Sequence, residues 1–444
     1  MIDSSLFERF PAYTDFDPMV PVARISPDGV PAIHRFYDTS PISPSGRYAA
    51  MLRFPYEDRS PSPGDDAQVL VVDLTTGDVV YRTPTASWDT QVGAHVQWGV
   101  SDEALFFNRI DTESWRAYGV RANIFTGEER PLAGTVYMIS PDGRLSATPS
   151  LEKIGIVQLG YGGAVPDLAR RRNRGAPDDD GLFLVDTETG QSRLLLSFAE
   201  IYERLQPRFP GISLDRGGFY GFHTKWNPQG TRLLFIVRWD ADGGRRYRTL
   251  NWLISVRPDG SDLTVAVDAE RWKQGHHPNW CPDGEHIVMN LSGENPRDPR
   301  VRAALLIART ARKLGLRYRP SIAQLRLMTF RYDGSELRSV APGHQGSGHP
   351  TMHLDGRHVL TDAYPAEPVS AGDGTVPIRL IDIESGTSQT VVRIRTRPFV
   401  SGRFDELRVD PHPAWDASGR YLVFNGCPDG TRAVFVADIA PLLT

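Results

Sequence analysis

Five histidines recur at one position of a repeated unit, where they could bind a metal or transfer protons. Four of them stand seven residues before the glycine that closes a turn: His223, His277, His349 and His412. His95 holds the same place ahead of a turn in which Asp102 replaces the glycine. Neutral imidazole nitrogens are common ligands of divalent transition metals, and imidazole also exchanges protons near neutral pH. If the units form a ring, the five side chains point at a common axis, which predicts a metal site or a proton-transfer site there.

The order of the units selects the first candidates for metal ligands. His277, His349 and His412 belong to consecutive units, and His223 belongs to the unit just before them. We therefore expect the first three as ligands and His223 as the fourth, with manganese first among the divalent ions and zinc, nickel, iron or calcium as alternatives. The simpler alternative is that some of these histidines are core residues that hydrogen-bond to the backbone.

The histidines stand on a repeat of short strands and turns. Seven copies of a turn of the Ser-Pro-Asp-Gly type occur, and a second turn closed by glycine follows in most of them. Two hairpins per copy give four antiparallel strands per copy. We therefore predict an all-β fold, a seven-bladed β-propeller of four-stranded blades that spans residues 1–444 as a single domain.

The two ends of the chain are expected to meet in one blade. The last copy of the repeat lacks a full fourth strand, and residues 21–26 could supply it, with 1–20 as an N-terminal arm. Closure by a terminal strand removes an exposed sheet edge, so it predicts a monomer or a weak homodimer.

Insertions between the second and third strands are expected to surround the histidine end of the ring. The largest lie near 152–180 and 293–323, and both are rich in arginine. Because guanidinium pairs with carboxylate or phosphate, we expect them to contact an anionic substrate. The candidates for this contact are Arg171, Arg172, Arg297 and Arg300. The alternative is that these arginines are solvated side chains of short helices, which we expect near 166–174, 198–205 and 298–315.

Composition and missing motifs exclude several classes of protein. A formal net charge of −4 argues against a nucleic-acid partner. No apolar run is long enough to suggest a membrane partner, and no secretory signal is visible, so a cytoplasmic protein is expected. Two cysteines do not make a disulfide framework. The chain also contains no Gly-x-Ser-x-Gly elbow, phosphate loop or dinucleotide fingerprint.

The run from His277 to Gly284, with its relatives at 223, 349 and 412, resembles the TolB-type propeller repeat. Within that group it is most similar to oligogalacturonate lyase and related propeller polysaccharide lyases. The resemblance implies a divalent metal held by central histidines and a glutamine, with a basic side chain that removes the C5 proton of a uronate. By this resemblance Gln345 is the candidate glutamine, and Arg216, ahead of His223, is the candidate catalytic arginine. The long rim loops depart from a compact enzyme of this kind, which leaves the particular uronate open.

The expected reaction is β-elimination from an acidic oligosaccharide or polysaccharide. The charge of the uronate carboxylate must be offset so that the C5 proton becomes acidic, and a base and an acid must lie within reach. His95 lies outside the neighbouring metal group and is the candidate base, with Tyr137 or Tyr364 as the acid. Tyr364 is also a candidate contact to the substrate. The alternative is a non-catalytic TolB-like propeller that binds a protein or a glycan.

Overall fold

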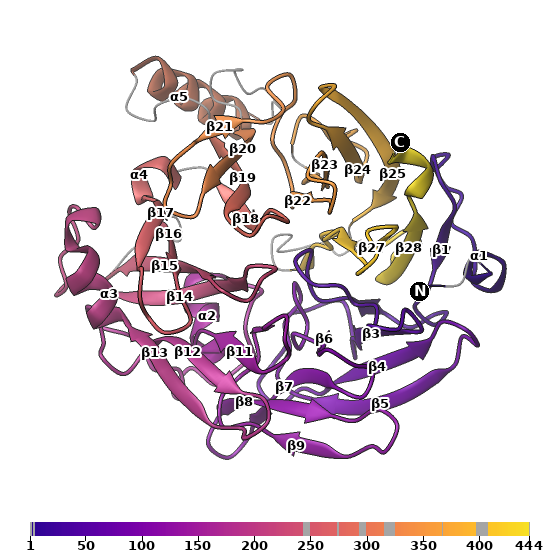
Figure 1. Ribbon diagram of the computed structural model, residues 1–444, viewed down its shortest axis with the longest axis horizontal. Helices are drawn as coiled ribbons and strands as arrows, with labels where there is room; N and C mark the ends of the chain where they lie inside the picture. The colour runs from indigo at the N-terminus through magenta and orange to yellow at the C-terminus, as the bar shows by residue number, and fades with distance from the viewer. Residues whose placement is uncertain are drawn as a thin grey trace.

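Seven four-stranded antiparallel sheets are arranged around a central axis, which confirms the predicted β-propeller (Figure 1). The computed structural model describes residues 2, 5–242, 249–272, 275–292, 299–314, 325–365, 367–396 and 407–443. Each of the first six sheets is built from consecutive strands, so each copy of the sequence repeat makes one blade.

The first three blades contain strands β2 to β13. The first blade consists of β2 (Ala32–Ile33), β3 (Tyr48–Arg53), β4 (Ala67–Asp73) and β5 (Val79–Thr85). The second consists of β6 (Gln97–Trp98), β7 (Leu105–Asp111), β8 (Arg116–Ala122) and β9 (Glu129–Pro131). The third consists of β10 (Met138–Ile139), β11 (Leu145–Thr148), β12 (Gly181–Asp186) and β13 (Ser192–Ser197).

The next three blades follow the same order. The fourth blade consists of β14 (Gly217–Trp226), β15 (Leu233–Ala241), β16 (Leu250–Val256) and β17 (Thr264–Val267). The fifth consists of β18 (His276–Trp280), β19 (His286–Ser292), β20 (Leu325–Arg331) and β21 (Arg338–Ser339). The sixth consists of β22 (Thr351–Met352), β23 (His358–Thr361), β24 (Thr375–Asp382) and β25 (Thr387–Arg395).

The seventh blade joins both ends of the chain, as the sequence predicted. It consists of β26 (Ala414–Trp415), β27 (Tyr421–Gly426), β28 (Ala433–Asp438) and the N-terminal strand β1 (Val22–Arg24). β1 pairs antiparallel with β28, with Ala23 opposite Val436. The N-terminal end lies on the side of this blade next to the first blade, and the C-terminal end on the side next to β25 (Figure 1).

The turn that identifies the repeat is fixed by its own side chains. In the third blade, the Ser140 hydroxyl donates to Asp142 Oδ1 at 2.5 Å, and the same oxygen accepts the backbone N–H of Arg144 at 3.1 Å. Gly143 closes the turn at a φ of 76°, a conformation that glycine adopts without strain. The serine, the aspartate and the glycine therefore fix the turn in this blade.

Apolar side chains fill the spaces between neighbouring blades. One buried cluster joins Ile42 and Val72 of the first blade to Val423 and Val436 of the seventh. Burial on both faces explains why β27 is buried along its whole length rather than in alternation. Packing of one sheet against the next thus holds the ring together.

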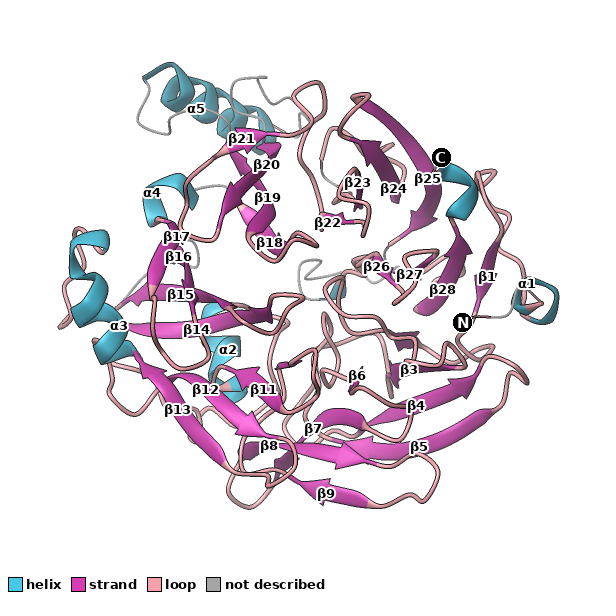
Figure 2. Cartoon of the chain, viewed as in Figure 1, coloured by secondary structure: helices cyan, strands magenta, loops and turns pink. Residues whose placement is uncertain are grey.

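The described helices are few and none is part of a sheet (Figure 2). The described helices are α1 (Leu6–Arg9), α2 (Leu151–Val157), α3 (Phe198–Leu205), α4 (Ala269–Trp272), α5 (Pro299–Lys313) and the short 3₁₀ segments η1 (Gln206–Arg208) and η3 (Ala440–Leu442). No helix in the described ranges is long and apolar enough to cross a bilayer.

Two of the three predicted helices are confirmed and one is wrong. α3 begins at a capping box in which Ser197 and Glu200 bond each other's backbone N–H groups, and α5 covers most of 298–315. The segment 166–174 contains a turn instead of a helix, while α2 forms nearer the start of the same insertion. The reason is that Leu168 is fully exposed, so this segment has no apolar face to pack against the blades.

The insertions lie between second and third strands, as expected. β11 and β12 are separated by 149–180, and β19 and β20 by 293–324, of which only 299–314 is described. In the fifth blade His276 pairs with Asn290, so the second strand ends beside the start of the first. The insertions therefore leave the sheets at the end where the histidines begin the inner strands.

Candidate metal and acid–base site

The repeated histidines converge on the axis from irregular points of the inner strands. His95, His277 and His412 have φ values of 56°, 58° and 48°, in the left-handed region that residues other than glycine rarely adopt. Gly348, just before His349, has a φ of 57°. Strained backbone of this kind is concentrated at functional sites, where it re-aims a side chain.

Three imidazoles form a contiguous group, which we call the histidine trio: His277, His349 and His412. The ring centroids are 3.9 Å apart for His277 and His349, and 4.4 Å apart for His349 and His412. The predicted first three ligands thus lie together. Gly348 is required beside them, because a Cβ there would collide with the carboxylate of Asp362.

Asp362 holds the central ring of the trio in place. Its Oδ1 and Oδ2 atoms lie 2.9 and 3.0 Å from Nδ1 of His349. The same carboxylate accepts the backbone N–H groups of His349 and His412, at 2.6 and 3.2 Å. Nε2 of His349 has no hydrogen-bond partner among the described residues. Metal-binding histidines typically donate the N–H of one ring nitrogen to a carboxylate and bind the metal with the other nitrogen. The surroundings of His349 fit this arrangement.

Asp410 adds a carboxylate that the sequence analysis did not single out. Its Oδ2 lies 3.8 Å from Nε2 of His412, and its two oxygens accept from Nε of Arg408 at 2.9 and 3.0 Å. Ligand atoms of His349, Asp410 and His412 all lie within 4.8 Å of one another. Neither ring nitrogen of His412 is hydrogen-bonded within the described part of the chain. These buried nitrogen and oxygen atoms fit a divalent transition metal.

The other two repeated histidines flank a buried tyrosine. The Tyr137 hydroxyl hydrogen-bonds Nδ1 of His223, and its ring centroid lies 4.7 Å from that of His95. Nε2 of His223 and both ring nitrogens of His95 lack hydrogen-bond partners among the described residues. We call His95, Tyr137 and His223 the tyrosine group.

Burial favours the neutral form of four of the repeated histidines and of two neighbouring tyrosines. It lowers the pKa of four histidines well below the ordinary value: His95, His223, His277 and His412. Burial likewise raises the pKa of Tyr137 and Tyr364 well above the usual range. Neutral imidazoles are able to bind a metal or accept a proton, and neutral phenols are able to donate one.

An excursion of the first inner strand fills the space between these groups. Ile33 pairs with Leu52 and Ile42 bridges to Ala49, so residues 34–41 lie opposite only two residues of β3. The extra chain projects toward the axis and carries Phe36 at its centre. Sequence analysis did not find this excursion, because nothing in its residue types distinguishes it from an ordinary strand and loop.

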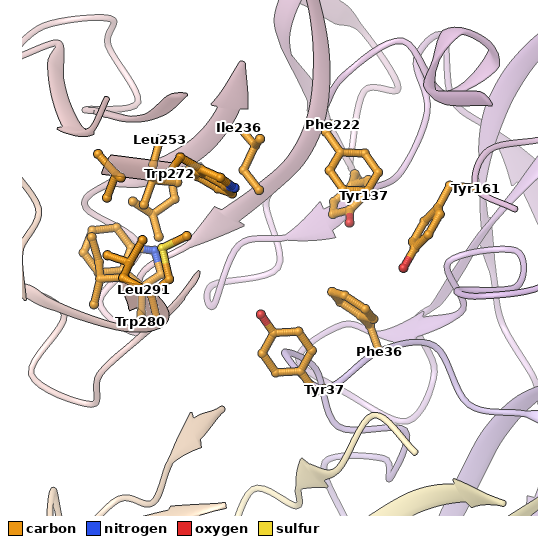
Figure 3. Packing of buried hydrophobic residues seen from close by; sticks show 14 of the residues in the cluster. Phe36, Tyr37, Tyr137, Tyr161, Phe222, Ile236, Leu253, Trp272, Trp280 and Leu291 are labelled. Atoms are coloured by element: carbon orange, nitrogen blue, oxygen red, sulfur yellow. The ribbon is translucent and has the colours of Figure 1, made fainter. Parts of the chain in front are cut away.

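Phe36 is fully buried and lies against four of the repeated histidines. Its ring centroid is 4.6 Å from that of His412, 5.2 Å from His223, 5.7 Å from His349 and 6.4 Å from His277. Figure 3 shows Phe36 among the rings of Tyr37, Tyr137 and Tyr161. His223 therefore meets Phe36 and Tyr137 directly, and its role as a fourth ligand stays a prediction.

A buried ion cluster anchors the excursion. Asp38 lies 2.8 Å from a guanidinium nitrogen of Arg35 and 3.1 Å from Nζ of Lys225, and all three side chains are almost fully enclosed. Lys225 also donates to the Tyr37 hydroxyl at 2.8 Å, and Arg35 donates to the carbonyl of Tyr137 at 2.6 Å. Burial alone would raise the pKa of Asp38, but Lys225 and Arg35 lower it below the usual value. Asp38 thus contacts Arg35 of the first blade and Lys225 of the fourth, and Arg35 connects the cluster to the backbone of Tyr137.

Most of the predicted substrate contacts do not reach the axis. Arg171, Arg172 and Arg300 are exposed, and Arg172 makes only a 4.0 Å ion pair with Asp240. Arg297 lies outside the described residues. These positions fit the alternative of solvated side chains at the rim.

Two further candidates are Tyr364, which lies beside His277, and Gln345. The Tyr364 hydroxyl is 3.4 Å from Nε2 of His277, and the guanidinium of Arg408 lies over its ring at 5.5 Å. Gln345 is half-buried, and its amide nitrogen has no hydrogen-bond partner among the described residues. Its backbone carbonyl accepts from Arg379 at 3.2 Å.

A different arginine from the expected one lies beside the tyrosine group. Arg216 is exposed just before β14, and seven residues of extended chain, about 23 Å, separate it from His223. Arg238 of β15 is instead partly buried, with its guanidinium 3.6 Å from the ring centroid of Phe222. Burial lowers the pKa of Arg238 to about 9. The sequence does not distinguish Arg238 from the other arginines that lie in strands, so it was not predicted.

No family model matches the chain, and no curated protein matches it. Solved structures do. An oligogalacturonate lyase in complex with manganese is 15% identical, covers 97% of this chain and 96% of its own, and has a TM-score of 0.61. The oligogalacturonate lyase of Vibrio parahaemolyticus is 14% identical, with 98% of each chain covered and a TM-score of 0.60. TolB of Acinetobacter baumannii is 11% identical over 86% of this chain and 78% of its own, with a TM-score of 0.40. At these identities the likeness concerns the fold.

Proposed function

We propose that this protein is a metal-assisted lyase that cleaves an acidic oligosaccharide by β-elimination at a uronate. The observation that carries the proposal is the grouping of His349, Asp410 and His412, whose ligand atoms lie within 4.8 Å of one another on the axis. The structural likeness to oligogalacturonate lyases, one of them in complex with manganese, supports this reading.

The trio and Asp410 are the residues that would hold the metal. Nε2 of His349 and the nitrogens of His412 are available, Asp410 supplies an oxygen, and His277 lies against the ring of His349. A divalent ion bound there would offset the charge of a uronate carboxylate and so make the C5 proton more acidic. Arg408 orients Asp410, because its Nε donates to both carboxylate oxygens.

The tyrosine group would handle the protons. In β-elimination a base takes the C5 proton, the C4–C5 double bond forms, and the C4 oxygen leaves with a proton from an acid. His95 is neutral with both nitrogens bare among the described residues, so it could accept a proton. Arg238 is the second candidate base, because its lowered pKa leaves a small neutral fraction near neutral pH. Tyr137 and Tyr364 are protonated and could serve as the acid.

Metal content and product absorbance test this proposal together. We expect about one Mn²⁺ per chain by mass spectrometry. On oligogalacturonate we expect the ultraviolet absorbance of an unsaturated uronide. The variant with His277, His349 and His412 each changed to Ala should lose both, whereas His286→Ala, a solvent-facing histidine of a distant turn, should keep both. Full activity in the triple variant would overturn the proposal.

One observation favours a second function, a non-catalytic propeller that binds a protein or glycan. The histidines are buried around Phe36, which is how ring-closing core residues would be packed. In that case the purified protein would bind no divalent metal at the axis, and the triple variant would change the free energy of unfolding without changing any metal stoichiometry.

A further inference from the structure

A second cluster of imidazoles lies at a turn between β22 and β23, away from the axis. We propose that His353, Asp355 and His358 form a separate binding site for a divalent transition metal such as Zn²⁺. The turn follows the inner strand that begins beside His349, so it lies at the opposite end of that strand from the trio. The site is independent of the lyase proposal, since it shares no residue with it.

Both histidines face the same carboxylate oxygen. Oδ2 of Asp355 lies 2.9 Å from Nδ1 of His353 and 2.7 Å from Nδ1 of His358. Ligand atoms of all three residues lie within 4.8 Å of one another. Bond lengths of about 2.0–2.2 Å to a tetrahedral Zn²⁺ place neighbouring ligand atoms about 3.3–3.6 Å apart, so the cluster needs only small adjustments to surround an ion.

The ring of His353 is held in position by the next blade. It lies 4.8 Å from the ring of Trp415 by centroids, and a Cβ on Gly419 would meet its Nε2. Nδ1 is therefore the nitrogen that faces the cluster, and it also accepts the backbone N–H of Asp355 at 3.3 Å. In the tautomer that accepts this N–H, Nδ1 carries no proton of its own, and a cation bound beside it would offset the negative charge of Asp355.

The other turns of the repeat lack this arrangement. In the third blade the residue equivalent to His353 is Ser140, which simply caps the turn through its hydroxyl. In the fifth blade it is Cys281, whose buried side chain packs in an apolar cluster, although Asp283 and His286 repeat the remaining pair at 2.6 Å. Two imidazoles on one carboxylate are therefore a special feature of the sixth-blade turn, and the fifth-blade turn is its natural control.

One carboxylate and two imidazoles leave coordination positions for water, a set that suits Zn²⁺, Ni²⁺ or Cu²⁺ better than Ca²⁺ or Mg²⁺. The side chain of Asp355 is 32% exposed, so an ion can reach the cluster from solvent. Because His353 packs on Trp415, a bound ion would tie the sixth blade to the seventh, in which both chain ends meet.

Calorimetric titration of the chelator-treated full-length protein with Zn²⁺ tests the site. In the triple variant of the trio we expect one Zn²⁺ per chain to remain, with a rise in Tm on binding. His353→Gln in the same background should weaken this binding by at least about tenfold, since loss of a ligand should cost no less than loss of an outer partner. His286→Gln, the control from the fifth blade, should leave it unchanged.

Two results would overturn the site: no Zn²⁺ bound by the folded triple variant, or equal binding with and without His353. If the triple variant does not fold, Co²⁺ absorption of the otherwise unchanged protein decides. We expect visible d–d bands that diminish in His353→Gln and in His358→Gln but persist in His286→Gln. Identical spectra in all four proteins would contradict the proposal. Loss of uronide cleavage, in contrast, would bear only on the axial site.

Discussion

Asp362 and His349 are joined at the axis by a carboxylate–imidazole contact of 2.9 Å, which leaves Nε2 of that ring without a hydrogen-bond partner in the described ranges. The contact fixes both the tautomer and the direction of the ring, since Nδ1 carries the proton that the carboxylate accepts. His349 is also the middle ring of the trio, so its orientation determines how the three nitrogens meet.

Replacing Asp362 with Asn should weaken axial metal binding. The amide is a poorer acceptor for Nδ1–H and lowers the basicity of His349, so we expect Mn²⁺ affinity to fall about 10- to 100-fold. Calorimetric titration measures it. Asp373→Asn, in the same loop but paired with Thr375, is the control and should leave the affinity unchanged. Equal affinities in both variants would show that Asp362 does not orient a ligand.

Acid should destabilise the protein through His95. Burial lowers the pKa of this ring well below its ordinary value, so the folded state keeps it neutral while the unfolded state takes up a proton below about pH 6.5. Its contribution to stability is therefore complete above pH 6.5 and is lost as pH falls. Between pH 7.5 and 5 the wild type should lose about 2 kcal/mol more than His95→Asn, measured by urea denaturation at each pH. Parallel curves would contradict this.

Replacing the anion of the Asp38 ion cluster should lower the free energy of unfolding more than replacing one of its cations. Asp38→Asn leaves Arg35 and Lys225 buried without their carboxylate, so we expect a loss of about 3–5 kcal/mol in the free energy of unfolding. Lys225→Met removes one cation but keeps the Arg35–Asp38 pair, and should cost distinctly less. Denaturant unfolding of both variants measures the difference. Equal losses would mean that the two ion pairs do not share one carboxylate in solution.

The junction of the chain ends should be sensitive to a single proline. The N–H of Ile25 donates to the carbonyl of Val434 at 2.9 Å, and its side chain is fully buried. Ile25→Pro removes that bond and should cost about 3 kcal/mol or more. Ile25→Val keeps the bond and should cost only about 0.5–1.5 kcal/mol. Thermal unfolding distinguishes them, and a Tm for the proline variant equal to that of the valine variant would show that the junction does not limit stability.

The number of blades could be predicted because each blade repeats the same kind of turn. In the third blade Ser140, Asp142 and Gly143 fix the turn locally, and six of the seven copies keep the closing glycine. The same repeat identified the histidines as equivalent, since each lies a fixed number of residues before the turn and therefore at the same point of its inner strand. The pairing of β1 with β28 could be predicted because the last copy of the repeat lacks a fourth strand of its own.

The rest of the site could not be predicted because it depends on departures from the repeat. Phe36 reaches the axis only through an excursion whose length is set by pairing with β3, and Asp362 and Asp410 meet the trio from the loops after β23 and before β26, in two different blades. The anion-binding role of the arginine-rich loops was predicted from their composition, but composition does not show which arginine side chain points toward the axis. Arg238 does so because Phe222 provides a ring for it to stack on.

The pairing of β1 with β28 also determines the order in which the molecule can be completed during synthesis. Residues 22–24 are synthesised long before their partners at 435–437. Such contacts between distant parts of a sequence form slowly, and until they form both strands keep an unpaired edge. The strand β1 therefore stays unpaired while six blades are synthesised, and the ring closes only after residues 435–437 have left the ribosome.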